Sequence, residues 1–74
     1  MQRIGVISLN AFKLKAKIVE RNITMDELAG LIGISTPTLY RKVKYPLRMT
    51  LMEVVKIKDI LNISDAEAID IFLA

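Results

Sequence analysis

Apolar residues recur at spacings of three and four along much of the chain, which is the period of an α-helix with one buried face. Ala11, Leu14 and Ile18 follow this spacing, and charged side chains occupy the opposite face. The pattern therefore predicts a first helix in this segment, with Ser8 or Asn10 as its N-cap.

Four further helix starts are indicated by side chains that cap the backbone. Residues 24–27, 50–53 and 64–67 each begin with Thr or Ser and end with Glu, the arrangement of a capping box. In this motif the hydroxyl accepts from the N–H of the Glu, and the carboxylate accepts from the N–H of the cap. Ser35 fits a fourth N-cap, because Pro37 is tolerated in the first turn of a helix. The predicted helices span residues 25–32, 36–43, 51–61 and 65–73.

Five short helices with short connections predict an all-α fold, a compact bundle that forms one domain over residues 1–74. Residues 1–8 precede the helical pattern and include a short apolar run. This run fits an N-terminal arm, a strand or a segment that packs on a partner.

Residues 24–43 combine two helices of similar length with a tight turn between them. Gly33 lies in the turn, where a positive φ lets the chain reverse direction without strain. Ala29 is small at the point where the second helix must cross closely over the first. This arrangement predicts a helix-turn-helix whose inner face is apolar and consists of Leu28, Ile32, Ile34 and Leu39.

Residues 10–73 resemble the lambda-repressor-like family of helix-turn-helix regulators, the Cro/cI group common in phages. The resemblance is carried by the spacing of Ala29 and Gly33 and by Gly-Ile-Ser-Thr-Pro-Thr-Leu-Tyr-Arg-Lys-Val at residues 33–43. The run at residues 50–64 fits the fourth helix of that family and the turn after it. The resemblance implies a bundle of four or five helices, usually dimeric, that binds a double-stranded DNA operator with two half-sites.

Parts of the sequence differ from that family. Lys42 stands where the family often has an apolar core residue, and Lys58 stands where it often has a small one. The segment at residues 38–43 is also similar to the tetracycline-repressor-like family. Because recognition residues vary widely within such families, the operator sequence does not follow from the resemblance.

The second helix of a helix-turn-helix enters the major groove of DNA, with its N-terminal residues nearest the base edges. We therefore expect Thr36, Thr38, Tyr40 and Arg41 to supply specificity. Short hydroxyl side chains bond base edges, and a Thr methyl group contacts a thymine methyl group. Arg41 is placed to contact either a guanine or a phosphate.

Other residues near this helix are expected to contact the phosphate backbone. Lys42, Lys44 and Arg48 carry positive charge just after the base-reading residues. The backbone N–H groups at the two helix starts, Met25 and Thr36, are oriented to bind phosphate. The complete candidate DNA-binding site is Met25, Ser35, Thr36, Pro37, Thr38, Tyr40, Arg41, Lys44 and Arg48.

Charge is unevenly distributed along the chain. Residues 1–48 carry nine Lys and Arg against three Asp and Glu, and residues 49–74 carry two against five, within a net charge of +3. A basic front half and an acidic back half suit a protein that presents one side to a polyanion. Charge alone fits an unevenly charged solvated surface equally well.

Composition excludes several kinds of site. The sequence has no Cys and no His, which rules out disulfides, the usual zinc sites and a nucleophile activated by His. We expect no enzymatic activity, no metal and no cofactor. No apolar stretch approaches the length of a membrane span, and we expect a cytoplasmic protein.

The C-terminal segment is more apolar than one buried face requires. We expect a homodimer that forms through Ile69, Phe72 and Leu73 of the last helix. The alternative is that Phe72 and Leu73 close the core of the monomer. An alternative function keeps the fold but makes it a protein-interaction module, for instance an antirepressor that binds another regulator.

Overall fold

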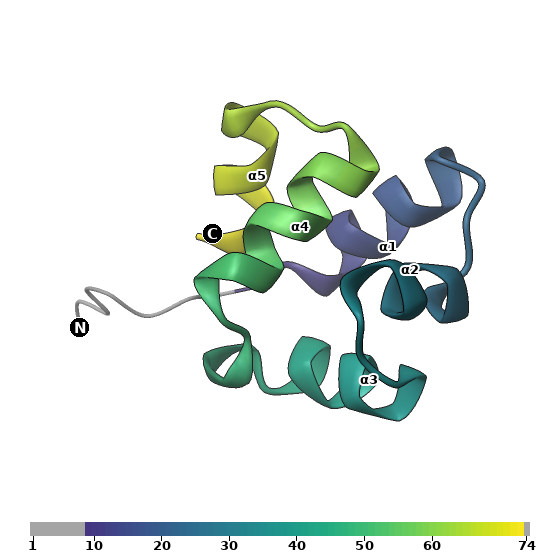
Figure 1. Cartoon of the computed structure of the whole chain (residues 1–74). Helices are drawn as coiled ribbons and strands as arrows, with labels where there is room; N and C mark the ends of the chain where they lie inside the picture. Colours follow the sequence, from purple (N-terminus) through teal and green to yellow (C-terminus); the bar gives the residue numbers. More distant parts are fainter. Residues whose placement is uncertain (1–8, 74) are drawn as a thin grey trace.

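The computed structural model describes residues 9–73, so the predicted arm at residues 1–8 and the alternative cap Ser8 lie outside the described residues. Five α-helices and one 3₁₀-helix make up the described part, in agreement with the predicted all-α bundle (Figure 1). The helix of residues 36–43 is one residue longer than predicted, the last helix is one residue shorter, and the 3₁₀-helix was not predicted. The elements are α1 (Ala11–Glu20), α2 (Met25–Ile32), α3 (Thr36–Lys44), η1 (Pro46–Arg48), α4 (Leu51–Leu61) and α5 (Asp65–Phe72).

Side-chain caps determine where each α-helix begins. The three predicted capping boxes are all present, at Thr24, Thr50 and Ser64. Asn10 caps α1 by accepting from the N–H of Lys13 at 3.1 Å. These bonds satisfy N–H groups that have no partner within the helix itself. The sequence therefore specifies the helix boundaries locally.

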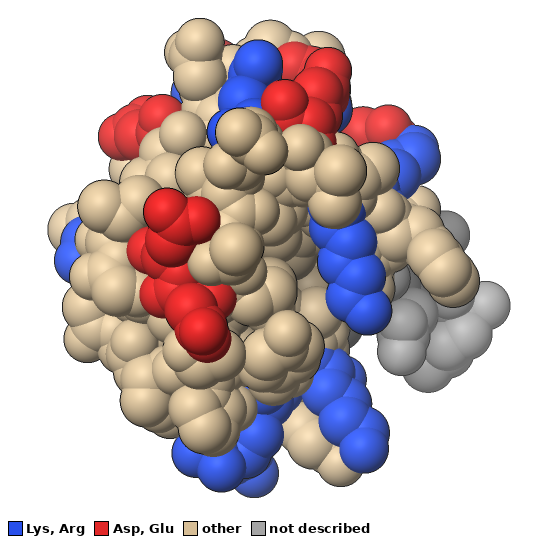
Figure 2. Space-filling view, turned by 90° about the vertical axis from the view of Figure 1, so that its right-hand side faces the viewer, with Lys and Arg blue, Asp and Glu red and all other residues tan. Residues whose placement is uncertain are grey.

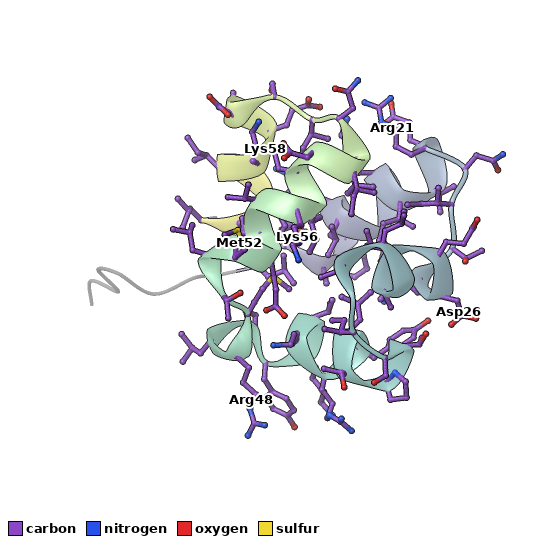
Figure 3. All side chains as sticks on the ribbon, in the orientation of Figure 1. Arg21, Asp26, Arg48, Met52, Lys56 and Lys58 are labelled. Atoms are coloured by element: carbon purple, nitrogen blue, oxygen red, sulfur yellow. The ribbon has the colours of Figure 1, made fainter. Side chains whose placement is uncertain are left out.

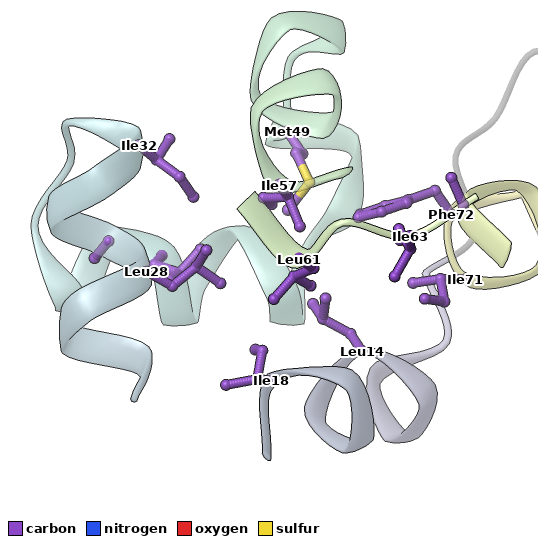
Figure 4. Packing of buried hydrophobic residues seen from close by; sticks show 13 residues of the cluster. Leu14, Ile18, Leu28, Ile32, Met49, Ile57, Leu61, Ile63, Ile71 and Phe72 are labelled. Atoms are coloured by element: carbon purple, nitrogen blue, oxygen red, sulfur yellow. The ribbon is translucent and has the colours of Figure 1, made fainter. Parts of the chain in front are cut away.

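Thirteen apolar side chains from all five α-helices and the loops before α4 and α5 form the core (Figure 4). Leu28, Ile57 and Leu61 are completely buried within it. Phe72 is only 2% exposed and packs into the same core. The expectation that Phe72 forms a dimer surface is therefore wrong, because its ring is already covered within one chain.

The helices are arranged so that α3 and η1 lie at one end of the bundle (Figure 1). α2 packs against both α3 and α4, and α5 packs against α1 and α4. The N–H of Asn10 donates to the carbonyl of Ile71 at 2.7 Å, which ties the start of α1 to α5. Among residues 9–73, no helix has the length and apolar character required to cross a membrane.

Gly33 forms the joint between α2 and α3. Its φ of 95° places it in the left-handed region, as the sequence predicted. The N–H groups of Gly33 and Ile34 both donate to the carbonyl of Ala29, at 2.9 and 3.0 Å. This turn ends α2 and sets the direction in which α3 leaves it.

Replacing Gly33 with Ala is expected to destabilise the protein by about 1–2 kcal/mol, because a Cβ in the left-handed region is strained. No atom lies within 4 Å of the added Cβ, so a steric clash with a neighbour does not contribute. Gly30→Ala is the matched control, since Gly30 is helical and equally uncrowded. It should stabilise by roughly 0.5–1 kcal/mol. Urea unfolding measures both, and equal effects would contradict the backbone argument.

Candidate nucleic-acid interface

α3 is anchored on one side and open on the other. Leu39 is 1% exposed and fixes the helix against α2. Ser35 caps its start by accepting from the N–H of Thr38 at 3.3 Å. On the other side Pro37, Tyr40, Arg41 and Lys44 are exposed, and Thr36 and Thr38 are half-buried. The fold thus brings the predicted α3 residues onto one accessible helix.

Three side chains on this helix are linked by hydrogen bonds. The Ser35 hydroxyl donates to Oγ1 of Thr38 at 2.7 Å. Nη2 of Arg41 donates to the same oxygen at 3.3 Å. The bond from Arg41 spans three residues, which is one turn of helix and places both side chains on the same face. The guanidinium is therefore held toward the N-terminal half of α3.

A second group of side chains lies at the other end of α3. The Lys44 ammonium lies 5.5 Å from the centre of the Tyr45 ring, and the Arg48 guanidinium lies 5.9 Å from it. Both distances permit cation–π attraction. Figure 3 shows Arg48 at the lower edge of the molecule, below η1. Tyr45 was not among the predicted site residues, although an aromatic residue between two cations was the available sequence signal.

Lys42 is engaged within the fold. Its ammonium donates to the carbonyl of Arg48 at 3.0 Å and lies 3.1 Å from Oε1 of Glu53. The same Glu53 oxygen accepts from the N–H of Thr50, the cap of α4. These bonds join α3, η1 and α4, and they remove Lys42 from the expected phosphate contacts.

The charge of Glu53 is stabilised where it meets Lys42. Burial raises the pKa of this carboxyl, but the N–H of Thr50 and the Lys42 ammonium together lower it by more. The net pKa lies below the ordinary value, so Glu53 is ionised at neutral pH. Lys42 thus occupies a position where the family often has an apolar residue. Its charge is accommodated there because it pairs with the Glu53 carboxylate.

Most other cations are also occupied by partners away from α3. Lys17 lies 2.6 Å from Glu67 and lowers the pKa of that carboxyl to about 2, with help from the N–H of Ser64. Lys58, which stands where the family often has a small residue, pairs with Asp65 at 3.0 Å. The remaining bonds are from Lys13 to Asp70, from Lys56 to the carbonyl of Ile32, and from Arg21 to the carbonyls of Leu61 and Asn62.

This pairing leaves few cations for a ligand. Within residues 9–73, only Lys15, Arg41, Lys44 and Arg48 have no bond to a carboxylate or a backbone carbonyl. Three of these four lie on α3 and η1. Figure 2 shows Lys and Arg side chains along the lower end of the molecule, the level of α3 in Figure 1, with acidic side chains above them.

The start of α2 contributes less clearly to this surface. Met25 is half-buried and packs against the core, so only its backbone is placed to bind a phosphate. The capping box already uses the N–H groups of Thr24 and Glu27. Asp26 is exposed at the same helix start (Figure 3). Its negative charge opposes a phosphate there.

A helix-turn-helix with most of its free cations on the second helix and the turn after it is the arrangement expected of a DNA-binding domain. A family model described as a Cro/C1-type HTH DNA-binding domain matches residues 13–72. The chain belongs to this family. Neither the curated proteins nor the solved structures include a significant match to it. The resemblance that the sequence shows over residues 10–73 is thus confirmed over residues 13–72.

The Lys42–Glu53 pair is expected to stabilise the domain by about 1–2 kcal/mol, between the values of exposed and buried pairs. Their side chains are 18% and 15% exposed. A double-mutant cycle with Lys42→Met and Glu53→Gln measures the coupling by urea unfolding. The Gln retains an acceptor for the cap.

The matched control for this cycle is Lys58→Met with Asp65→Asn. Asp65 is 89% exposed in its pair. Its coupling should therefore be roughly 0.5 kcal/mol or less. A coupling for Lys42 and Glu53 no larger than the control would show that the pair does not join α3 to α4 energetically.

Proposed function

We propose that this Cro/C1-type domain is a sequence-specific transcriptional regulator, a repressor of the phage type, that inserts α3 into the major groove of double-stranded DNA. The observation that carries the proposal is the placement of free cations. Within residues 9–73, internal bonds occupy six of the ten Lys and Arg side chains, and three of the four left over lie on α3 and η1. The net charge alone does not indicate which face of the protein would meet DNA.

The order of residues along α3 suits that role. Thr36, Pro37 and Thr38 form its first turn, the part nearest the base edges in a docked helix-turn-helix. Lys44 and Arg48 lie at the opposite end, where cations bind phosphates without reading sequence. The nine residues of α3 span about 13–14 Å at the rise of an α-helix, which is close to the width of the major groove.

The proposal is tested by titrating the protein with a pool of genomic duplexes at low and moderate salt, with fluorescence anisotropy as the readout. A regulator should bind a subset tightly and keep that preference as salt rises. Weak binding that is equal for all duplexes and disappears with salt would instead favour the alternative, a module that docks on another regulator.

The salt dependence of DNA binding shows which lysines contact phosphates. Lys44→Met should lower affinity for all sequences alike and reduce the slope of log affinity against log salt by about 1, because one phosphate contact is lost. Lys42→Met removes an equal charge, but that charge is already paired with Glu53. Its slope should stay at the wild-type value. Equal changes in the two slopes would contradict the assignment.

We propose further that two copies associate through α4 and α5. Ile69 and Leu73 are 56% and 59% exposed, and Leu51 on α4 is more exposed still. With the buried Phe72 ring, these side chains line an apolar hollow of about 180 Å³. α4 and α5 lie on one side of the bundle, beside the end that holds α3 (Figure 1). The proposal places the two-fold axis on that side, and it requires both copies of α3 to face one DNA duplex.

Ile69→Asp should weaken dimerisation about tenfold or more, because a charge would be buried in an apolar contact. Leu31→Asp is the matched control, since Leu31 is 62% exposed but lies on α2. Sedimentation equilibrium measures association, and far-UV circular dichroism checks the fold. A monomeric wild-type protein, or equal effects of the two variants, would refute this interface.

A further inference from the structure

The chemistry of α3 narrows the kind of base that it can recognise. This inference rests on the proposed function, because it assumes that α3 enters the major groove. The nine residues of α3 include no Asn, Gln, Asp or Glu. Asn and Gln are the side chains that pair with adenine in two places, and Asp and Glu accept from cytosine. The exposed face therefore lacks the usual readers of both bases.

Hydrogen bonds within the helix reduce its acceptors further. Oγ1 of Thr38 accepts from both Ser35 and Arg41, which occupies its two lone pairs. The Ser35 oxygen accepts from the N–H of Thr38, and its hydrogen is given to the Thr38 hydroxyl. Thr38 is thus left with a hydrogen to donate outward. The Thr36 and Tyr40 hydroxyls can both donate and accept, whereas Thr38 and Arg41 present only donors to DNA.

The sequence left two contacts open for Arg41, a guanine or a phosphate, and the position of its guanidinium favours the guanine. Its bond to Thr38 holds it toward the first turn of α3, which is the base-reading end. The other two free cations of this surface, Lys44 and Arg48, surround Tyr45 at the opposite end. The Arg41 guanidinium is therefore directed away from the group best placed for phosphates. Most of its five N–H donors remain free for a forked contact.

We propose that Arg41 reads a guanine in each operator half-site, and that Thr38 is the positioning residue that directs the guanidinium to it. Guanine presents two acceptors, N7 and O6, in the major groove, and Arg bonds both. The forked donors of Arg41 match both acceptors of this edge, whereas adenine presents one acceptor beside an amino group and cytosine presents an amino group. The ligand is thus a duplex with a G·C pair opposite the middle of α3.

The experiment begins with a randomised duplex library, from which the full chain selects its preferred sequence. Each dG of that duplex is then replaced singly by 7-deaza-dG, which lacks N7. One replacement per half-site should weaken binding about tenfold. Inosine at the same position is the control, because it keeps N7 and O6 and loses only the minor-groove amino group. Its effect should be small.

Variants of the protein then test whether Arg41 and Thr38 are the residues that recognise that guanine. Arg41→Met should bind the dG and 7-deaza-dG duplexes equally. Thr38→Val keeps the shape but lacks the hydroxyl that accepts from Arg41. It should lose most of the discrimination while its salt slope stays unchanged. Thr38→Ser restores the hydroxyl and should restore the discrimination, a rescue that a purely structural role of Thr38 does not predict.

The outcomes distinguish this inference from the function on which it rests. A selected sequence whose discrimination survives Arg41→Met, with the salt slope reduced by about 1, would make Arg41 a phosphate contact and overturn the inference alone. Discrimination that survives Thr38→Val would overturn the positioning role. Failure of the wild-type chain to enrich any duplex would overturn the regulator function and, with it, this inference.

Discussion

The helices of this domain are too short to be stable alone, and this constraint shapes the rest of the structure. They contain 8 to 11 residues, whereas an isolated helix shorter than about 12–15 residues is marginal in water. Each α-helix therefore has a side-chain cap at its start, and each contributes residues to one small core. Because caps and core fix the ends of α3, they also determine which of its side chains face outward.

The small size of the domain also explains how a net charge of only +3 leaves one face of the protein basic. A small bundle has little interior, so its helices are also joined by ion pairs such as Lys17–Glu67 and Lys42–Glu53. Every such pair removes a cation from the field outside the protein. The cations that remain on α3 and η1 leave unpaired positive charge at that face, although the sequence as a whole is only weakly basic.

Local signals in the sequence predicted much of the fold, and long-range contacts account for what they missed. The capping boxes and Gly33 depend on residues within four positions, so helix starts and the turn were predictable. The sequence predicts a phosphate contact for Lys42 because Glu53, eleven residues later, meets it only in the folded chain. Likewise, periodicity did not show that Phe72 turns inward while Ile69 stays exposed.

Folding and recognition share the same atoms at the start of α3. Ser35 caps the helix through the N–H of Thr38, and its hydroxyl also bonds the side chain that holds Arg41. A substitution at Ser35 thus changes both the stability of α3 and the direction of the guanidinium. A substitution at Thr38 leaves the backbone cap intact and changes the hydroxyl that accepts from Arg41 and Ser35. Sequence preference in this domain is therefore more easily altered at Thr38 than at the residue that caps the helix.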